Sequence, residues 1–187
     1  MKIDTFLENL GIADHPGLRI ERRLMGYENF TFGCRITLCR PSARHLAHEL
    51  AHASQFGPKH FKRRARQYGF NFKMRTVTVV NTICDEPNTA HATVRELETF
   101  AFQAHLLELA GVRVNHARYF RRAALIMTNH MPDWYAVPGE SEAERFKWCV
   151  QKAKALYART PAAVVLDRLK GWLDETARHL ATQPLAA

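Results

Sequence analysis

The stretch Arg44–Gln55 reads RHLAHELAHASQ and places three histidines and one glutamate among leucines and alanines. Such residues favour an α-helix, on which His48 and His52, four positions apart, project from one face. Two imidazoles placed in this way can bind one cation, and Glu49 lies beside them in an HExxH pattern. The alternative, two helix histidines bonded to neighbouring carbonyl groups, would need several buried partners. We therefore expect a metal site, around which the rest of the fold is organised.

Two histidines do not complete a metal site, so a third ligand must come from elsewhere in the chain. Ligands at positions i, i+3 and i+7 of one straight helix diverge, which makes His45 a supporting residue. His60 could take part only if the chain turned back sharply after Gly57. Glu96 is the strongest candidate, because a carboxylate from another helix supplies the charge that two neutral imidazoles lack. Glu98 would then point away, as a surface or supporting charge.

Two histidines and one carboxylate leave coordination positions open, which argues against a closed structural site. With Zn²⁺ the enzyme would hydrolyse an amide, with Glu49 as the general base that activates water. With Fe(II) the open positions would accept O₂ and substrate, and the reaction would be an oxidation. The ligand types do not choose between these two chemistries.

A small sheet is predicted before the motif helix. The segments GLRIERRL (17–24) and FTFGCRITLC (30–39) look like strands, the second with a bulge at Gly33. Ser42 is placed to cap the motif helix, and a second helix is predicted over residues 58–68.

After a β-branched strand at residues 73–82, the pattern becomes wholly helical. Together with a short helix at Thr5–Leu10, the predicted helices are Ala90–Ala110, Asn115–Asn129, Ser141–Arg159 and Ala162–Thr182. The fold class is therefore α+β, with a small N-terminal sheet, the HExxH helix and a mostly helical C-terminal half. A length of 187 residues with 47% apolar content suits a single domain over 1–187.

The net charge of +9 favours an acidic partner, which could be nucleic acid, an acidic protein or an anionic surface. The basic run Lys59–Lys73 is interleaved with aromatic residues, as in proteins that bind RNA, although most such runs are solvated helix faces. No apolar stretch is long enough to span a membrane and the N-terminus lacks the features of a signal peptide, so we expect a cytoplasmic protein with reduced cysteines.

Several segments resemble known families in the same order along the chain. The HExxH helix with a downstream glutamate is similar to ImmA/IrrE-type metallopeptidases, and the helix with its basic continuation is similar to the SprT group. A broader resemblance is to the elongation factor P hydroxylase family. It is carried by CRITL before HELAH, by KRRARQYGFNF, by LLELAGVRVN after the glutamate, and by the later YFRRA, MTNHMP and LYARTP.

This resemblance implies a zincin-like fold and a non-haem iron enzyme that hydroxylates a modified lysine of elongation factor P, an acidic protein. His48, His52 and Glu96 would bind the metal, with Fe(II) favoured and Zn²⁺ the other candidate. The loop Asn81–His91 is longer than its counterpart in the family, and its role is open. The order of the segments favours the hydroxylase over a gluzincin-like zinc peptidase; a non-catalytic basic binding protein is the third hypothesis.

Overall fold

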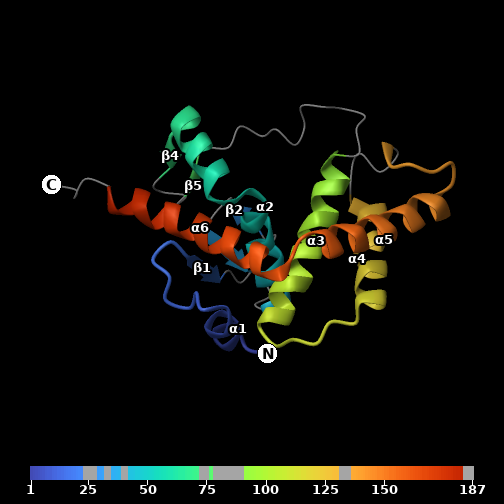
Figure 1. Ribbon diagram of the computed structural model, residues 1–187, viewed down its shortest axis with the longest axis horizontal. Coiled ribbons are helices and arrows are strands. Elements are labelled where there is room, and N and C mark those ends of the chain that lie inside the picture. Colours follow the sequence, from blue (N-terminus) through green and yellow to red (C-terminus); the bar gives the residue numbers. More distant parts are fainter. Residues whose placement is uncertain are drawn as a thin grey trace.

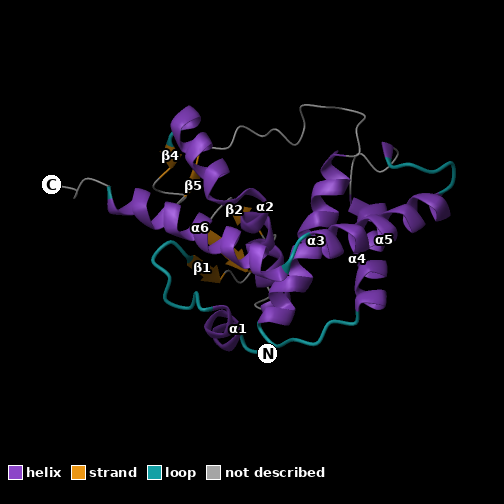
Figure 2. Ribbon diagram, viewed as in Figure 1, coloured by secondary structure: helices purple, strands orange, loops and turns teal. Residues whose placement is uncertain are grey.

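Helices dominate the part of the protein that the structure, a computed structural model, describes: residues 1–22, 29–31, 35–38, 42–71, 76–77, 91–130 and 136–182 (Figures 1 and 2). The helices are α1 (Ile3–Leu10), α2 (Ala43–Tyr68), α3 (His91–Leu109), α4 (His116–His130), α5 (Glu142–Arg159) and α6 (Ala162–Ala181). The prediction of a mostly helical C-terminal half is confirmed. No helix in these ranges carries an apolar run long enough to cross a bilayer.

The strands are short and precede or follow α2. They are β1 (Arg19–Arg22), β2 (Asn29–Thr31), β3 (Arg35–Leu38), β4 (Phe70–Asn71) and β5 (Thr76–Val77). In the three-stranded sheet, β3 lies in the centre, parallel to β1 and antiparallel to β2. The second sheet is the antiparallel pair of β4 and β5.

One strand prediction needs correction, and another lies largely outside the described residues. The segment predicted as one strand over residues 30–39 contains parts of two strands, β2 and β3, which pair antiparallel, with Phe30 opposite Ile36. Alternating hydrophobicity cannot reveal this reversal, because both strands of a hairpin alternate. The strand predicted at 73–82 is described only at Thr76–Val77. Gly33 and residues 78–90, which include most of the long loop, lie outside the described residues.

Helix α2 runs through both of the helices predicted at positions 44–68 and is kinked between them. Its first turn is capped as expected, since the Ser42 hydroxyl accepts a hydrogen bond from His45 N at 3.2 Å. At Gly57 the backbone leaves the helical region (φ 64°, ψ 178°), a conformation that glycine adopts without strain. Pro58 then opens the second half, where its missing N–H costs nothing. The kink separates the histidine motif from the basic half of α2.

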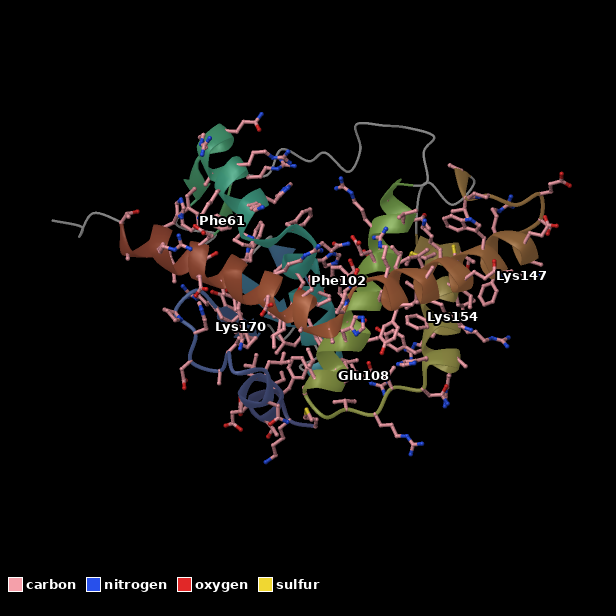
Figure 3. All side chains as sticks on the ribbon, viewed as in Figure 1. Phe61, Phe102, Glu108, Lys147, Lys154 and Lys170 are labelled. Atoms are coloured by element: carbon pink, nitrogen blue, oxygen red, sulfur yellow. The ribbon has the colours of Figure 1, made fainter. Side chains whose placement is uncertain are left out.

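Helix α6 packs closely against the kinked helix. A Cβ at Gly171 would lie 2.8 Å from Cγ of Pro58, so only glycine allows α6 to approach the kink this closely. One helical turn after Pro58, the buried ring of Phe61 packs edge to face against Trp172 of α6, with 4.9 Å between ring centroids (Phe61 is labelled in Figure 3). These contacts hold the second half of α2 in place.

Helix α3 lies in the centre of the helical array and contacts α2, α4, α5 and α6. Almost every side chain from Leu97 to Leu107 is buried; the exception is Glu98, which is half-buried. Phe102, labelled in Figure 3, is fully buried in the single hydrophobic core cluster of the described residues. A helix buried nearly all round is a rigid support for polar side chains directed at a neighbour.

Candidate metal centre

The two histidines of the HExxH motif lie next to each other on the first half of α2. The imidazole rings of His48 and His52 are 5.0 Å apart between centroids and nearly perpendicular. Phe100 of α3 packs on His48, with ring centroids 4.9 Å apart. Both histidines are partly buried, so they lie where α2 faces α3 without being sealed from solvent.

Glu96 of α3 reaches both histidines. Its Oε1 lies 2.8 Å from Nε2 of His48, and its Oε2 lies 3.7 Å from Nε2 of His52. One ligand atom from each of the three residues lies within 4.8 Å of the other two. The three residues predicted to bind the metal are therefore brought together by two helices, and within the described ranges no further His, Cys, Asp or Glu joins this group.

Nδ1 of His48 faces an oxygen acceptor, which leaves Nε2 directed at Glu96. The Gln103 side chain donates from Nε2 to the Arg44 carbonyl at 2.7 Å, so its Oε1 is left to face His48. That oxygen lies 3.3 Å from Nδ1 of His48 and also accepts a hydrogen bond from the Tyr119 hydroxyl. An Nδ1–H held by an oxygen acceptor is the usual arrangement for a histidine that binds a metal through Nε2.

His52 is oriented in the same way, with oxygen acceptors beside its Nδ1, but by different residues. The Thr99 hydroxyl donates to the Arg95 carbonyl at 3.1 Å, so its oxygen accepts from Nδ1 of His52, also at 3.1 Å. Oε1 of Gln55 is a second acceptor, 3.3 Å from the same nitrogen. Both imidazoles thus keep Nε2 for the side occupied by Glu96.

The ionisation of these groups depends on their mutual contacts. Burial acts to lower the pKa of His48, but the hydrogen bond and charge of Glu96, with the charge of Glu49, raise the pKa overall. At His52 burial prevails and lowers the pKa to about 4. Burial acts to raise the pKa of Glu96, but the hydrogen bond from His48 and the charge of His52 lower it overall.

The donor set fits a divalent cation. An ionised Glu96 and a neutral His52 are both ready to act as ligands, and a cation would take the place of the Nε2 proton of His48. One carboxylate and two imidazole nitrogens match the three-ligand sets of catalytic zinc and of non-haem iron. The arrangement can do chemistry rather than only stabilise the fold, because three protein ligands leave further positions for water or substrate.

The other residues singled out in the sequence lie around this cluster. Glu49 is buried, 7% exposed, and its negative charge reaches His48. His45 is exposed, one turn before His48. Glu98 accepts a hydrogen bond from Gln55 at 3.3 Å and pairs with Arg159 at 3.4 Å, so it supports the residue that holds His52.

His60 is placed away from the three converging ligands. It lies beyond the kink at Gly57, where its Nε2 accepts a hydrogen bond from Nε of Arg64 at 3.2 Å and its Nδ1 lies 3.1 Å from the guanidinium group of Arg63. Burial, followed by the charges of these arginines and Arg95, lowers the pKa of His60 to about 4. Three nearby cationic groups disfavour a metal ion at this position. Its place in the fold therefore gives His60 no part in the candidate metal centre.

Sequence reasoning missed the residues that orient the histidines: Gln55, Thr99, Gln103 and Tyr119. A signal for two of them was present, since Glu96, Thr99 and Gln103 are polar residues at positions i, i+3 and i+7 of the same helix. Such spacing places them on one face, the face that meets the histidine motif. Tyr119 had no comparable signal, because it comes from another helix.

Replacing Gln103 by leucine is expected to weaken divalent metal binding by about 10- to 100-fold, the usual cost of losing a group that orients a metal-binding histidine. A competition titration against a chromophoric chelator measures the effect. Gln151→Leu, at an exposed position on α5, is the control and should bind metal like the parent protein. Equal affinities for the two variants would show that Gln103 does not orient His48.

Comparisons with known proteins give no further assignment. No family model, no curated protein and no solved structure matches the chain. The assignment of a candidate metal centre therefore depends on the geometry of His48, His52 and Glu96 alone.

Proposed function

We propose that the protein is a metal-dependent enzyme that binds one divalent ion, Fe(II) in preference to Zn²⁺, through His48, His52 and Glu96. The observation that carries the proposal is the convergence of two Nε2 atoms and one carboxylate, with both Nδ1 positions held by oxygen acceptors. Such a site matches the two-histidine, one-carboxylate set of non-haem iron oxygenases. The activation of O₂ is the chemistry that Fe(II) supplies when bound.

The proposed reaction is hydroxylation of a lysine side chain on a protein similar to elongation factor P, in the cytoplasm. The order of the sequence segments supports this choice, as does a zincin-like succession in which the strands β1 and β3 precede the HExxH helix. A net charge of +9 suits an acidic protein substrate. In this reaction Glu96 supplies the negative ligand, while Gln103 and Thr99 hold the imidazoles in position.

The second candidate is a zinc peptidase of the gluzincin type. It is favoured by one specific observation, the burial of Glu49 beside His48, where a general base for amide hydrolysis would be needed. A non-catalytic basic protein that binds nucleic acid is the third candidate. It would bind through the charge alone, so its affinity would fall steeply with salt and would not respond to a chelator.

Anaerobically prepared protein is expected to bind one Fe(II) per chain and to consume O₂ when it is given modified elongation factor P and a two-electron reductant. One oxygen atom of O₂ would enter the lysine side chain as a hydroxyl group, and the other would leave as water with two electrons from the reductant and two protons. Metal analysis and an oxygen electrode measure the two quantities, and mass spectrometry of the substrate should show the mass of one added oxygen atom. The control is the same mixture with unmodified elongation factor P. Zinc-only occupancy together with cleavage of peptide substrates would contradict the hydroxylase proposal.

A further inference from the structure

A pocket with a volume of about 270 Å³ lies between the start of α2, the end of α3 and the start of α4. Four arginines line it: Arg44, Arg113, Arg118 and Arg122. Its apolar lining includes Leu107, which is buried, and Tyr119, which is partly buried. In Figure 3 the label on Glu108, the residue after Leu107, marks the end of α3 near this place. We call it the arginine pocket.

The positive charge of the arginine pocket is not balanced by the described residues that line it. None of the described residues that line it is acidic. Throughout the described ranges, none of its four guanidinium groups forms an ion pair with a carboxylate. Four like charges around one concavity repel one another, so an anion bound between them would relieve that repulsion.

The N-terminus of α4 also favours a bound anion in the arginine pocket. The first turn of a helix favours acidic residues, because its free N–H groups carry partial positive charge. The first turn of α4 holds no acidic residue and instead carries Arg118, whose backbone N–H is capped by Oδ1 of Asn115 at 3.1 Å. Asn115 also lines the pocket. The helix end and the arginines therefore attract negative charge to the same place.

We propose that the arginine pocket binds the phosphate group of a small phosphorylated molecule. A phosphate has three terminal oxygens and up to two charges, so it can engage several guanidinium groups at once, whereas a carboxylate has two oxygens and one charge. The volume lies just below the range of about 300 to 1,000 Å³ typical of small-molecule sites, which suits a compact ligand. Leu107 and the ring of Tyr119 would contact its apolar part.

The arginine pocket is separate from the metal centre but connected to it. None of its lining residues is a candidate metal ligand, so the inference stands even if the protein binds no metal. The connection is the Tyr119 hydroxyl, which bonds to Gln103, the same side chain that contacts Nδ1 of His48. Tyr119 and Gln103 therefore link the pocket to Nδ1 of His48.

Phenyl phosphate is the probe that tests the proposal, in calorimetric titrations of the full chain at constant ionic strength. It should bind at one site per chain. Its affinity should exceed that of inorganic phosphate because of the apolar lining, and it should exceed that of benzoate, which lacks the phosphate group, by about tenfold or more. Arg122→Gln should weaken its binding about tenfold or more, the factor expected for one lost charge-assisted hydrogen bond.

Arg121→Gln is the matched control, since Arg121 is the neighbouring residue on the same helix, is equally exposed and does not line the pocket. It removes the same charge and should change the affinity by less than about twofold. An equal loss in both variants would overturn the proposal, because the binding would then depend on net charge alone. Phosphate bound at a metal ion would be insensitive to both substitutions, which would also overturn it.

A single-stranded RNA oligonucleotide tests the other source of phosphate. The proposal expects RNA to bind weakly and to lose its affinity steeply as salt increases, without a difference between Arg121→Gln and Arg122→Gln. Tight RNA binding that depends on Arg122, while phenyl phosphate fails to bind, would overturn the proposal in favour of a nucleic-acid surface.

Discussion

Replacing His48, His52 or Glu96 by alanine is expected to abolish stoichiometric metal binding. Each residue supplies one of the three converging ligand atoms found in the described part of the chain, so the remaining two would hold an ion far more weakly. The affinity should fall well beyond the roughly 10- to 100-fold cost of losing a supporting residue. Metal analysis after dialysis should give one ion per chain for the parent protein and close to none for the variants.

His60→Ala is the control for this experiment, because it removes a histidine from the same helix. His60 is bonded to Arg63 and Arg64 beyond the kink, so its loss should leave the stoichiometry at one ion per chain. Circular dichroism verifies that each variant keeps its helices. Full metal occupancy in a folded His48→Ala or Glu96→Ala variant would show that the ion is bound elsewhere.

Replacing Glu49 by glutamine is expected to leave metal binding intact and to separate the two enzyme hypotheses. In a zinc peptidase Glu49 would be the general base, and its loss should slow amide hydrolysis by about 10² to 10⁴-fold. The proposed hydroxylase does not need Glu49 to remove a proton from an attacking water. We therefore expect the rate of O₂ consumption by the variant to stay within about tenfold of that of the parent protein. Assays of both reactions on the same preparations provide the comparison.

Glu98→Gln is the matched control for Glu49→Gln. Both substitutions replace a carboxylate by an amide near the candidate metal centre, but Glu98 contacts Gln55 and Arg159 rather than the histidine motif. It should therefore have little effect on either reaction. A peptidase activity that is lost in Glu49→Gln and kept in Glu98→Gln would contradict the hydroxylase proposal and support the second candidate.

The histidine pair of the candidate metal centre was predictable because it follows from local spacing, whereas Glu96, in a distant segment, was predictable only through the need for a third, negatively charged ligand. His48 and His52 are one helical turn apart in the sequence, and any helix that contains them brings their rings together. Glu96 was a stronger inference than Glu98 because the two cannot share a face, and the structure directs Glu96 to the histidines and Glu98 to Gln55. The capping role of Ser42 was predictable for the same local reason.

Features that depend on contacts between distant segments were not predictable. The pairing of β2 with β3 depends on a reversal of the chain that alternating hydrophobicity does not encode. The arginine pocket combines Arg44 with three arginines about seventy residues later in the sequence. The packing of α3 against both α2 and α4 makes them neighbours, and no periodicity in the sequence reports such packing.

The kink at Gly57 has a consequence for how this protein could evolve. It divides α2 into a half that carries the histidine motif and a half that carries the basic run. Helix α6 packs against the second half, where Gly171 approaches Pro58 and Trp172 contacts Phe61. Because the two halves do not share one continuous helix axis, exposed charges beyond the kink can change without rotating His48 or His52. Natural variants could therefore acquire new binding partners while the geometry of the candidate metal centre stays the same.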